Sequence, residues 1–217
     1  MAKAEKYRGR MQHAKRAQLY ADRFETGPRK AINRREQRAV TRIFAGLGDC
    51  RSVLDIPSGA GRFAKTLSAG GRKVIGADSA FEILEYGHQR AVKSGLPVSF
   101  LQADAAKLPF SDGALDGIFC NRLLHHILSA RERAVFLKEF HRVTKRYLVI
   151  SFFDYRSFGV VRRFLKALKG RKPTYAQQPT FEEFTEEVLA AGFKVQAVVR
   201  TGAAWVAQKY FVLEKAS

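Results

Sequence analysis

Residues Val53–Phe63 read VLDIPSGAGRF, and this stretch is the most informative about the fold. Val53 and Leu54 favour a buried strand, which runs into an acid, Asp55, and then into glycines at positions 59 and 61. Because glycine has no side chain, a bound group can touch the backbone there, and the free amides at the start of a following helix attract polar ligands. The pattern therefore predicts a strand, a turn and a helix that together hold a ligand.

Short apolar runs alternate with amphipathic stretches along the rest of the chain. We expect seven strands, at Ser52–Ile56, Lys73–Ala77, Val98–Gln102, Leu115–Cys120, Tyr147–Phe152, Phe193–Arg200 and Trp205–Leu213. Strands that alternate with helices predict an α/β fold, in which helices cover both faces of a parallel sheet. In such sheets the ligand lies beyond the carboxyl ends of the strands, where the glycine turn would stand.

Three of the intervening helices carry capping boxes at their expected starts. In each, a hydroxyl residue is followed three positions later by a glutamate, at Ser79–Glu82, Ser129–Glu132 and Thr180–Glu183. We therefore expect helices to begin at these three places.

The glycine turn fits two kinds of nucleotide site. Residues 59–64 match the dinucleotide pattern G-x-G-x-x-A, and Asp78 lies at a suitable distance for a ribose-binding acid. Three features oppose a nicotinamide dehydrogenase: Asp55 ends the first strand, Asp104 follows the third, and the chain has no Tyr-x-x-x-Lys pair for short-chain hydride transfer.

Three stretches in order carry a more specific resemblance: VLDIPSGAGRF, VIGADSA and FLQADAAKLPFSDGALDGIFCNRLLHHI. They resemble the motifs of class I S-adenosylmethionine-dependent methyltransferases, above all the group that includes the ubiquinone and menaquinone methyltransferases. The resemblance covers about residues 50–155 well and 180–217 loosely. It implies a Rossmann-like, seven-stranded, mostly parallel sheet flanked by helices on both faces, with S-adenosylmethionine as the cofactor.

The resemblance also implies which residues bind the cofactor. They all lie at or just after the ends of the first four strands: Asp55, Ser58, Gly59, Gly61, Asp78, Ser79, Asp104, Ala105 and Asn121. Asp55 and the turn would hold the methionine part, whose ammonium needs a counter-charge when buried. Asp78 would accept the ribose hydroxyls, Asp104 with Ala105 would bind the adenine edge, and Asn121 would face the sulfonium.

Methyl transfer from a sulfonium depends on alignment, although a hydroxyl acceptor benefits from a general base. His125 and His126 follow the fourth strand and are our candidates for that base, with substrate positioning or loop packing as alternatives. No spacing in the sequence is typical of metal ligands. Methyltransferases that act on nucleobase amines typically have an (Asp/Asn)-Pro-Pro-aromatic turn after the fourth strand, whereas this chain has CNRL. Cys120 is expected to pack in the core.

The chain departs from the resemblance at two places. Pro57 stands where the family usually has its first glycine, so this position lacks an amide and the turn should differ slightly. Thr144–Arg146 replaces the usual Lys-Pro-Gly-Gly turn, which predicts a tighter entry to the fifth strand.

The net charge of +19 is unevenly distributed. Residues 1–42 contain 13 basic and 4 acidic side chains, and residues 156–174 contain 7 basic and no acidic ones. We expect a basic N-terminal helical arm (1–45) and a methyltransferase domain (46–217) that carries a basic amphipathic lid at about 156–178. Such segments attract nucleic acid, anionic membrane surfaces or phosphorylated ligands, and solubility is the simpler alternative.

Three functions remain open from the sequence. We favour methyl transfer to a small-molecule, lipid or envelope acceptor of quinone or lipopolysaccharide type, near an anionic surface. The alternatives are an RNA methyltransferase, and a sensor or scaffold that binds a phosphate-bearing ligand such as a cyclic dinucleotide. RNA or the dinucleotide would bind through Arg34, Arg35 and Arg38, of which Arg34 and Arg38 form an Arg-x-x-x-Arg pair.

The sequence has neither a secretory leader nor an apolar run of the roughly 20 residues that span a bilayer. With only two cysteines, we expect a cytoplasmic protein that its basic segments could bring to the inner membrane.

Overall fold

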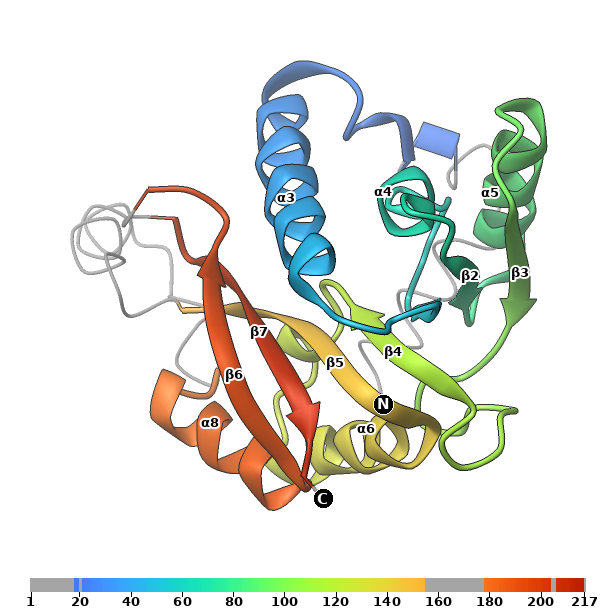
Figure 1. Ribbon diagram of the computed structural model, residues 1–217. Coiled ribbons are helices and arrows are strands. Elements are labelled where there is room, and N and C mark those ends of the chain that lie inside the picture. Colours follow the sequence, from blue (N-terminus) through green and yellow to red (C-terminus); the bar gives the residue numbers. More distant parts are fainter. Residues whose placement is uncertain (1–17, 20, 155–177, 204–205, 217) are drawn as a thin grey trace.

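The computed structural model describes residues 18–19, 21–154, 178–203 and 206–216. Its centre is a seven-stranded sheet with the strand order β3-β2-β1-β4-β5-β7-β6 (Figure 1). The strands are β1 (Ser52–Asp55), β2 (Lys73–Asp78), β3 (Val98–Gln102), β4 (Leu115–Cys120), β5 (Thr144–Phe153), β6 (Phe193–Arg200) and β7 (Gln208–Lys215). The expected strands are thus all present, with small shifts at their ends.

The sheet is mostly parallel. Neighbours among β1 to β5 pair in parallel, whereas β7 lies antiparallel between β5 and β6. This confirms the predicted α/β fold. The chain crosses from β3 on one side of β1 to β4 on the other, so the carboxyl ends of β1 and β4 lie side by side where such sheets form ligand crevices.

Helices cover both faces of the sheet (Figure 1). They are α3 (Gly27–Gly46), α4 (Ala64–Ser68), α5 (Phe81–Lys93), the 3-10 helix η1 (Leu124–His126), α6 (Ala130–Val143) and α8 (Phe181–Ala190). Alternate strand residues face opposite sides: Leu54 and Ile118 pack in a cluster with α6 and α8, while Val53 and Phe119 pack in a second cluster with α3 and α4. Because apolar side chains alternate between the two faces of these strands, the sheet lies between two hydrophobic clusters.

Two of the three predicted capping boxes mark helix starts. At α8, Thr180 and Glu183 form the full box, and at α6 the Ser129 hydroxyl accepts from the Glu132 amide. The prediction at Ser79 is wrong, because α5 has Ala80 as its N-cap and no side-chain cap. The Asp78 carboxylate accepts from the amide of Ala80, at 3.1 Å, and thereby orients the residue just before the helix.

The entry to β5 is tight, as the sequence predicted. Thr144–Arg146 belong to the strand itself, which begins where α6 ends, and the pairing with β4 shifts register between Leu115 and Gly117. The Thr144 hydroxyl donates to backbone carbonyls, among them that of Tyr147 at 3.0 Å. No separate turn therefore stands between the helix and the strand.

The two basic segments are described only in part. Residues 1–17 and most of the proposed lid lie outside the described residues, but α3 is described over its full length. Ala39, Val40, Ile43 and Phe44 of α3 are buried in the cluster that it shares with the sheet. Among the described residues, no helix has the length and apolar character needed to cross a membrane.

Candidate functional site

Four of the predicted cofactor residues lie in a row along the carboxyl edge of the sheet. Asp55 ends β1, Asp78 ends β2, Asp104 follows β3 by two residues, and Asn121 follows β4 directly. The strand order β3-β2-β1-β4 makes these four positions neighbours in space. The sequence motifs, which are separated along the chain, thus meet at one edge.

The glycine turn is held by the acid that ends β2. Asp78 is buried, and its Oδ2 accepts from the Gly59 amide at 3.1 Å. Gly59 and Gly61 have φ values of +54° and +68°, which side chains other than glycine rarely adopt. A Cβ on Gly61 would also lie 3.0 Å from the ring of Phe100. The turn therefore requires glycine at both positions.

The rest of the turn is anchored to β2. The Ser58 amide donates to the Ala77 carbonyl at 2.7 Å, and Ser58 is itself buried. The preceding peptide bond, Ile56–Pro57, is cis, and Pro57 has no amide to donate, as the sequence predicted.

Asp55 is a buried acid, and one of its carboxylate oxygens makes no hydrogen bond to the described residues. The side chain is 2% exposed, and its Oδ1 has no hydrogen-bond partner among the described residues. Burial raises the pKa of Asp55 to about 8, against the opposing charge of Arg62 and with a further increase from Asp78. A buried carboxyl group of this kind is suited to a cationic ligand, whose charge would favour the ionised form.

The positions predicted to hold the adenine and ribose lie beside this centre. Asp104 is exposed and its Oδ1 accepts from the Ala106 amide at 2.9 Å, whereas Ala105 is buried. Gln102, at the end of β3, donates from its side chain to the Ser79 carbonyl at 3.1 Å. These contacts bring the ends of β2 and β3 together and leave the Asp104 carboxylate at the surface.

Asn121 belongs to a buried polar network that the sequence did not predict. Its Oδ1 accepts from Gln208 Nε2 at 3.2 Å and from the Tyr210 hydroxyl at 3.1 Å. Burial raises the pKa of Tyr210 well above its usual range, so the phenol keeps its proton and can donate. The carboxamide oxygen of Asn121 is therefore directed to β7, and the side-chain amide and backbone are the groups left for a ligand.

The two histidines lie on η1, beside the carboxyl end of β5. Their ring centroids are 3.8 Å apart, and the ring of His125 is 4.5 Å from that of Phe153. His125 is half-buried and His126 is exposed. The Gln178 side chain donates to the backbone carbonyl of His125, which ties the segment before α8 to this loop.

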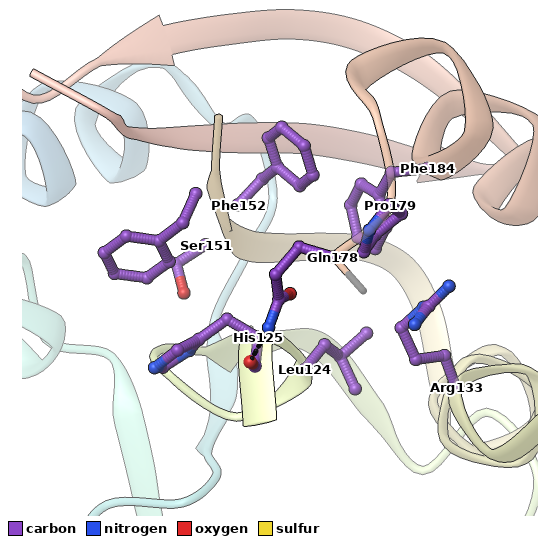
Figure 2. Close-up of a pocket in the computed structure, with 9 residues that line it drawn as sticks. Leu124, His125, Arg133, Ser151, Phe152, Gln178, Pro179 and Phe184 are labelled. Carbon is purple, nitrogen blue, oxygen red and sulfur yellow. Dashed lines mark hydrogen bonds between the residues drawn. The ribbon is translucent and has the colours of Figure 1, made fainter. Parts of the chain in front are cut away.

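A pocket opens next to His125 (Figure 2). Its enclosed space, between β5, η1 and the start of α8, has a volume of only about 10 Å³, and the rest of the hollow is open to solvent. Its walls include Ser151, Phe152, Phe153 and Phe184. The pocket is thus a shallow, partly aromatic surface beside an imidazole, which an acceptor can contact and to which it can give a proton.

Other candidate chemistry is limited. Among the described residues, no three His, Cys, Asp or Glu side chains gather in a way that could hold a metal ion. Cys120 is fully buried at the end of β4, and burial raises the pKa of its thiol, which agrees with the predicted packing role.

Comparison with known proteins gives matches to methyltransferases. Residues 53–147 match the family described as "Methyltransferase domain". A demethylmenaquinone methyltransferase of Thermus thermophilus is 43% identical over 70 residues, which are 31% of this chain and 32% of that protein. One of Clavibacter sepedonicus is 33% identical over 127 residues, 58% of this chain and 50% of that protein. The chain thus spans only a third to a half of these curated relatives.

Solved structures match over nearly the whole chain. Magnesium protoporphyrin IX methyltransferase from Synechocystis PCC 6803, with bound SAH, has a TM-score of 0.79 at 19% identity and covers 97% of this chain and 98% of its own. A cyclase matches with a TM-score of 0.68 at 18% identity, over 88% of this chain and 83% of its own. Residues 53–147 are therefore similar to methyltransferase domains, and the sheet and helices have the fold of the methyltransferase structures that match.

Proposed function

We propose that the protein is an S-adenosylmethionine-dependent methyltransferase that acts on a small-molecule or lipid acceptor. One observation carries the cofactor assignment: the buried Oδ1 of Asp55, which lacks a partner among the described residues, stands at the glycine turn. A dinucleotide would place a pyrophosphate there, which a buried carboxyl group disfavours. The cationic ammonium of S-adenosylmethionine would instead supply the missing partner.

The remaining cofactor contacts follow the order of the strands. Asp78 would hold the ribose, Asp104 with Ala105 the adenine, and the turn at Ser58–Gly61 the methionine carboxylate through its amides. Asn121 would face the sulfonium with its amide or backbone. The bound cofactor supplies an electrophilic methyl group, and these residues bind and orient it.

The acceptor would lie at the open side of the pocket beside η1. A hydroxyl of the acceptor must lose its proton as the methyl group arrives, and His125, which lines the pocket, or His126 beside it would receive that proton. The aromatic wall favours an acceptor with a flat or apolar body. Quinone- and lipopolysaccharide-type molecules are the first candidates, and the demethylmenaquinone methyltransferases among the relatives support the former.

RNA methylation is a second candidate, favoured by the exposed face of α3. Lys30, Arg34, Arg38 and Arg42 are exposed and recur every four residues, so they follow one side of the helix. Such a row can contact successive phosphates or a cyclic dinucleotide.

A sensor or a different enzyme on the same fold is a third possibility, because one of the matched structures is a cyclase.

One labelling experiment separates these functions. The protein is incubated with S-adenosylmethionine that carries a radioactive methyl group and with an extract of cells that lack the protein, and the extract is then fractionated. We expect label in the organic-soluble fraction, and much less with the Asp78→Ala variant at a cofactor concentration that does not saturate it. Label confined to RNA would contradict the lipid or small-molecule acceptor. Binding of the cofactor without any label transfer would favour the sensor.

A further inference from the structure

A glutamate of α3, outside the matched methyltransferase domain, is buried at the edge of the candidate site. Glu36 is 1% exposed, and its carboxylate forms ion pairs with two arginines, Arg62 and Arg122. Arg62 Nη1 lies 2.5 Å from Oε2, and Arg122 Nε lies 3.2 Å from Oε1. Burial of a carboxylate is costly unless partners of this kind compensate its charge, so both arginines are needed where they are.

The two arginines come from the two parts of the site. Arg62 directly follows Gly61 of the glycine turn, and its charge acts on Asp55. Arg122 directly follows Asn121 and begins the loop that leads to the histidines. It has a φ of +63°, and its amide donates to the Ser151 hydroxyl at 2.7 Å. One carboxylate therefore joins the turn after β1 to the loop after β4.

Aromatic rings extend this connection to the histidine pocket. The ring of Phe24 contacts both guanidinium groups, with its centroid 4.4 Å from Cζ of Arg62 and 5.7 Å from Cζ of Arg122. Arg122 Cζ also lies 5.2 Å from the centroid of the Phe153 ring, which is tilted by 45° against the ring of His125. Arg122 Nη2 donates to Gln208, whose own amide donates to Asn121.

We propose that Glu36 is a positioning residue that sets the glycine turn and the loop 121–127 relative to each other. Without its negative charge, two guanidinium groups would face each other at the site, and each would turn toward solvent. The turn and the loop would then lose their common anchor. This inference rests on the proposed function, because it assigns the two parts to cofactor and acceptor.

Hydrogen exchange and ligand binding of the full chain test the inference. In Glu36→Gln we expect faster amide exchange in both segments, 58–63 and 121–127, of the ligand-free protein. The affinity for S-adenosylhomocysteine should fall by about 3- to 30-fold, the range of coupling through such networks. Glu214→Gln is the matched control: Glu214 pairs with Arg146 at 2.7 Å, at the opposite edge of the sheet. It should leave both segments and the affinity unchanged.

The outcomes separate the two proposals. If the wild-type chain does not bind S-adenosylhomocysteine, the proposed function fails, whatever the exchange shows. If it binds and Glu36→Gln exchanges and binds like wild type, the positioning role is wrong. Should Glu36→Gln not fold, Glu36→Asp keeps the charge on a shorter side chain, and faster exchange in both segments together is expected. Unchanged exchange in that variant would equally contradict the inference.

Discussion

The carboxyl edge of the sheet has two halves that are built differently. The cofactor half, at the ends of β1, β2 and β3, consists of acids and a glycine turn between Asp55 and Asp104. The acceptor half, around η1, the ends of β4 and β5 and the start of β7, combines amides, aromatic rings and histidines. Its contacts join distant parts of the chain, such as Asn121 with Gln208 and Tyr210.

This difference indicates that the first half would bind the cofactor and that the second half would select the methyl acceptor. The acids of the cofactor half each lie at the end of a strand or just after it, so one local pattern places them all. The acceptor half depends on side chains brought together only by folding, including those of Gln178 and Glu36. Changes in the first half should act on cofactor affinity, and changes in the second on turnover.

The largest expected effect is on turnover, from the histidines. If one is the general base, its replacement by Asn should lower the rate of methyl transfer by about 10²–10⁴-fold and leave cofactor affinity nearly unchanged. We expect the greater loss for His125→Asn, because His125 lines the pocket. Steady-state assays with the acceptor from the labelling experiment measure this. Wild-type turnover in both single variants would return the histidines to packing or substrate positioning.

Asp78→Ala tests the cofactor half. The carboxylate would hold the ribose and already holds the Gly59 amide, so its loss should cost about 1.5–3 kcal/mol, or about ten- to a hundredfold in affinity for S-adenosylhomocysteine. Calorimetry measures the change. Asp112→Ala, which alters an exposed acid paired with Arg142, is the control and should bind like wild type. Equal affinities of the wild type, Asp78→Ala and Asp112→Ala would show that Asp78 does not bind the ligand.

Asp55 should also give the ligand-free protein a distinctive pH dependence. Its pKa rises from 3.8 to about 8 on folding, so between these values the folded chain holds a proton that the unfolded chain has released. The contribution of Asp55 to the free energy of unfolding is present at low pH and is lost as the pH rises toward 8. Thermal unfolding of wild type and Asp55→Asn at pH 5, 6.5 and 8 should show the difference in stability shifting in favour of the variant. Parallel curves would contradict the raised pKa.

The smallest effects concern the basic segments. Arg34→Gln, Arg35→Gln and Arg38→Gln together should remove RNA binding if α3 contacts phosphates, with a smaller salt dependence than wild type. The matching change of Arg162, Arg163 and Lys166 in the predicted lid should remove binding to anionic vesicles and spare RNA, at about 1 kcal/mol for each cation near the surface. Vesicle binding that survives the lid change would contradict the membrane proposal.

The sequence was sufficient to predict the sheet and to place the three acids at one edge of it. Strand ends marked by Asp55, Asp78 and Asp104 are local signals, and the strand order then makes them neighbours. The start of α5 was mispredicted because Ala80 is the N-cap residue and its amide donates to Asp78, so the Ser79 hydroxyl caps no helix amide.

The acceptor half and the α3 connection could not be predicted in the same way. Glu36 lies among arginines in the sequence NRREQR and has the composition of a solvated helix face, yet it is buried. Its burial depends on Arg62 and Arg122, which lie 26 and 86 residues away. Period 3.6 does place Glu36 on the face of Ala39, Val40 and Ile43, and this is the signal that could have identified it.

We propose above that the buried edge around Asp55 binds S-adenosylmethionine and no dinucleotide. Calorimetric titration of the full chain with S-adenosylhomocysteine, with S-adenosylmethionine and with NADH tests this directly. We expect binding of both sulfur ligands and none of NADH, and weaker binding of both by Asp55→Asn. Tight binding of NADH with no heat from either sulfur ligand would contradict it.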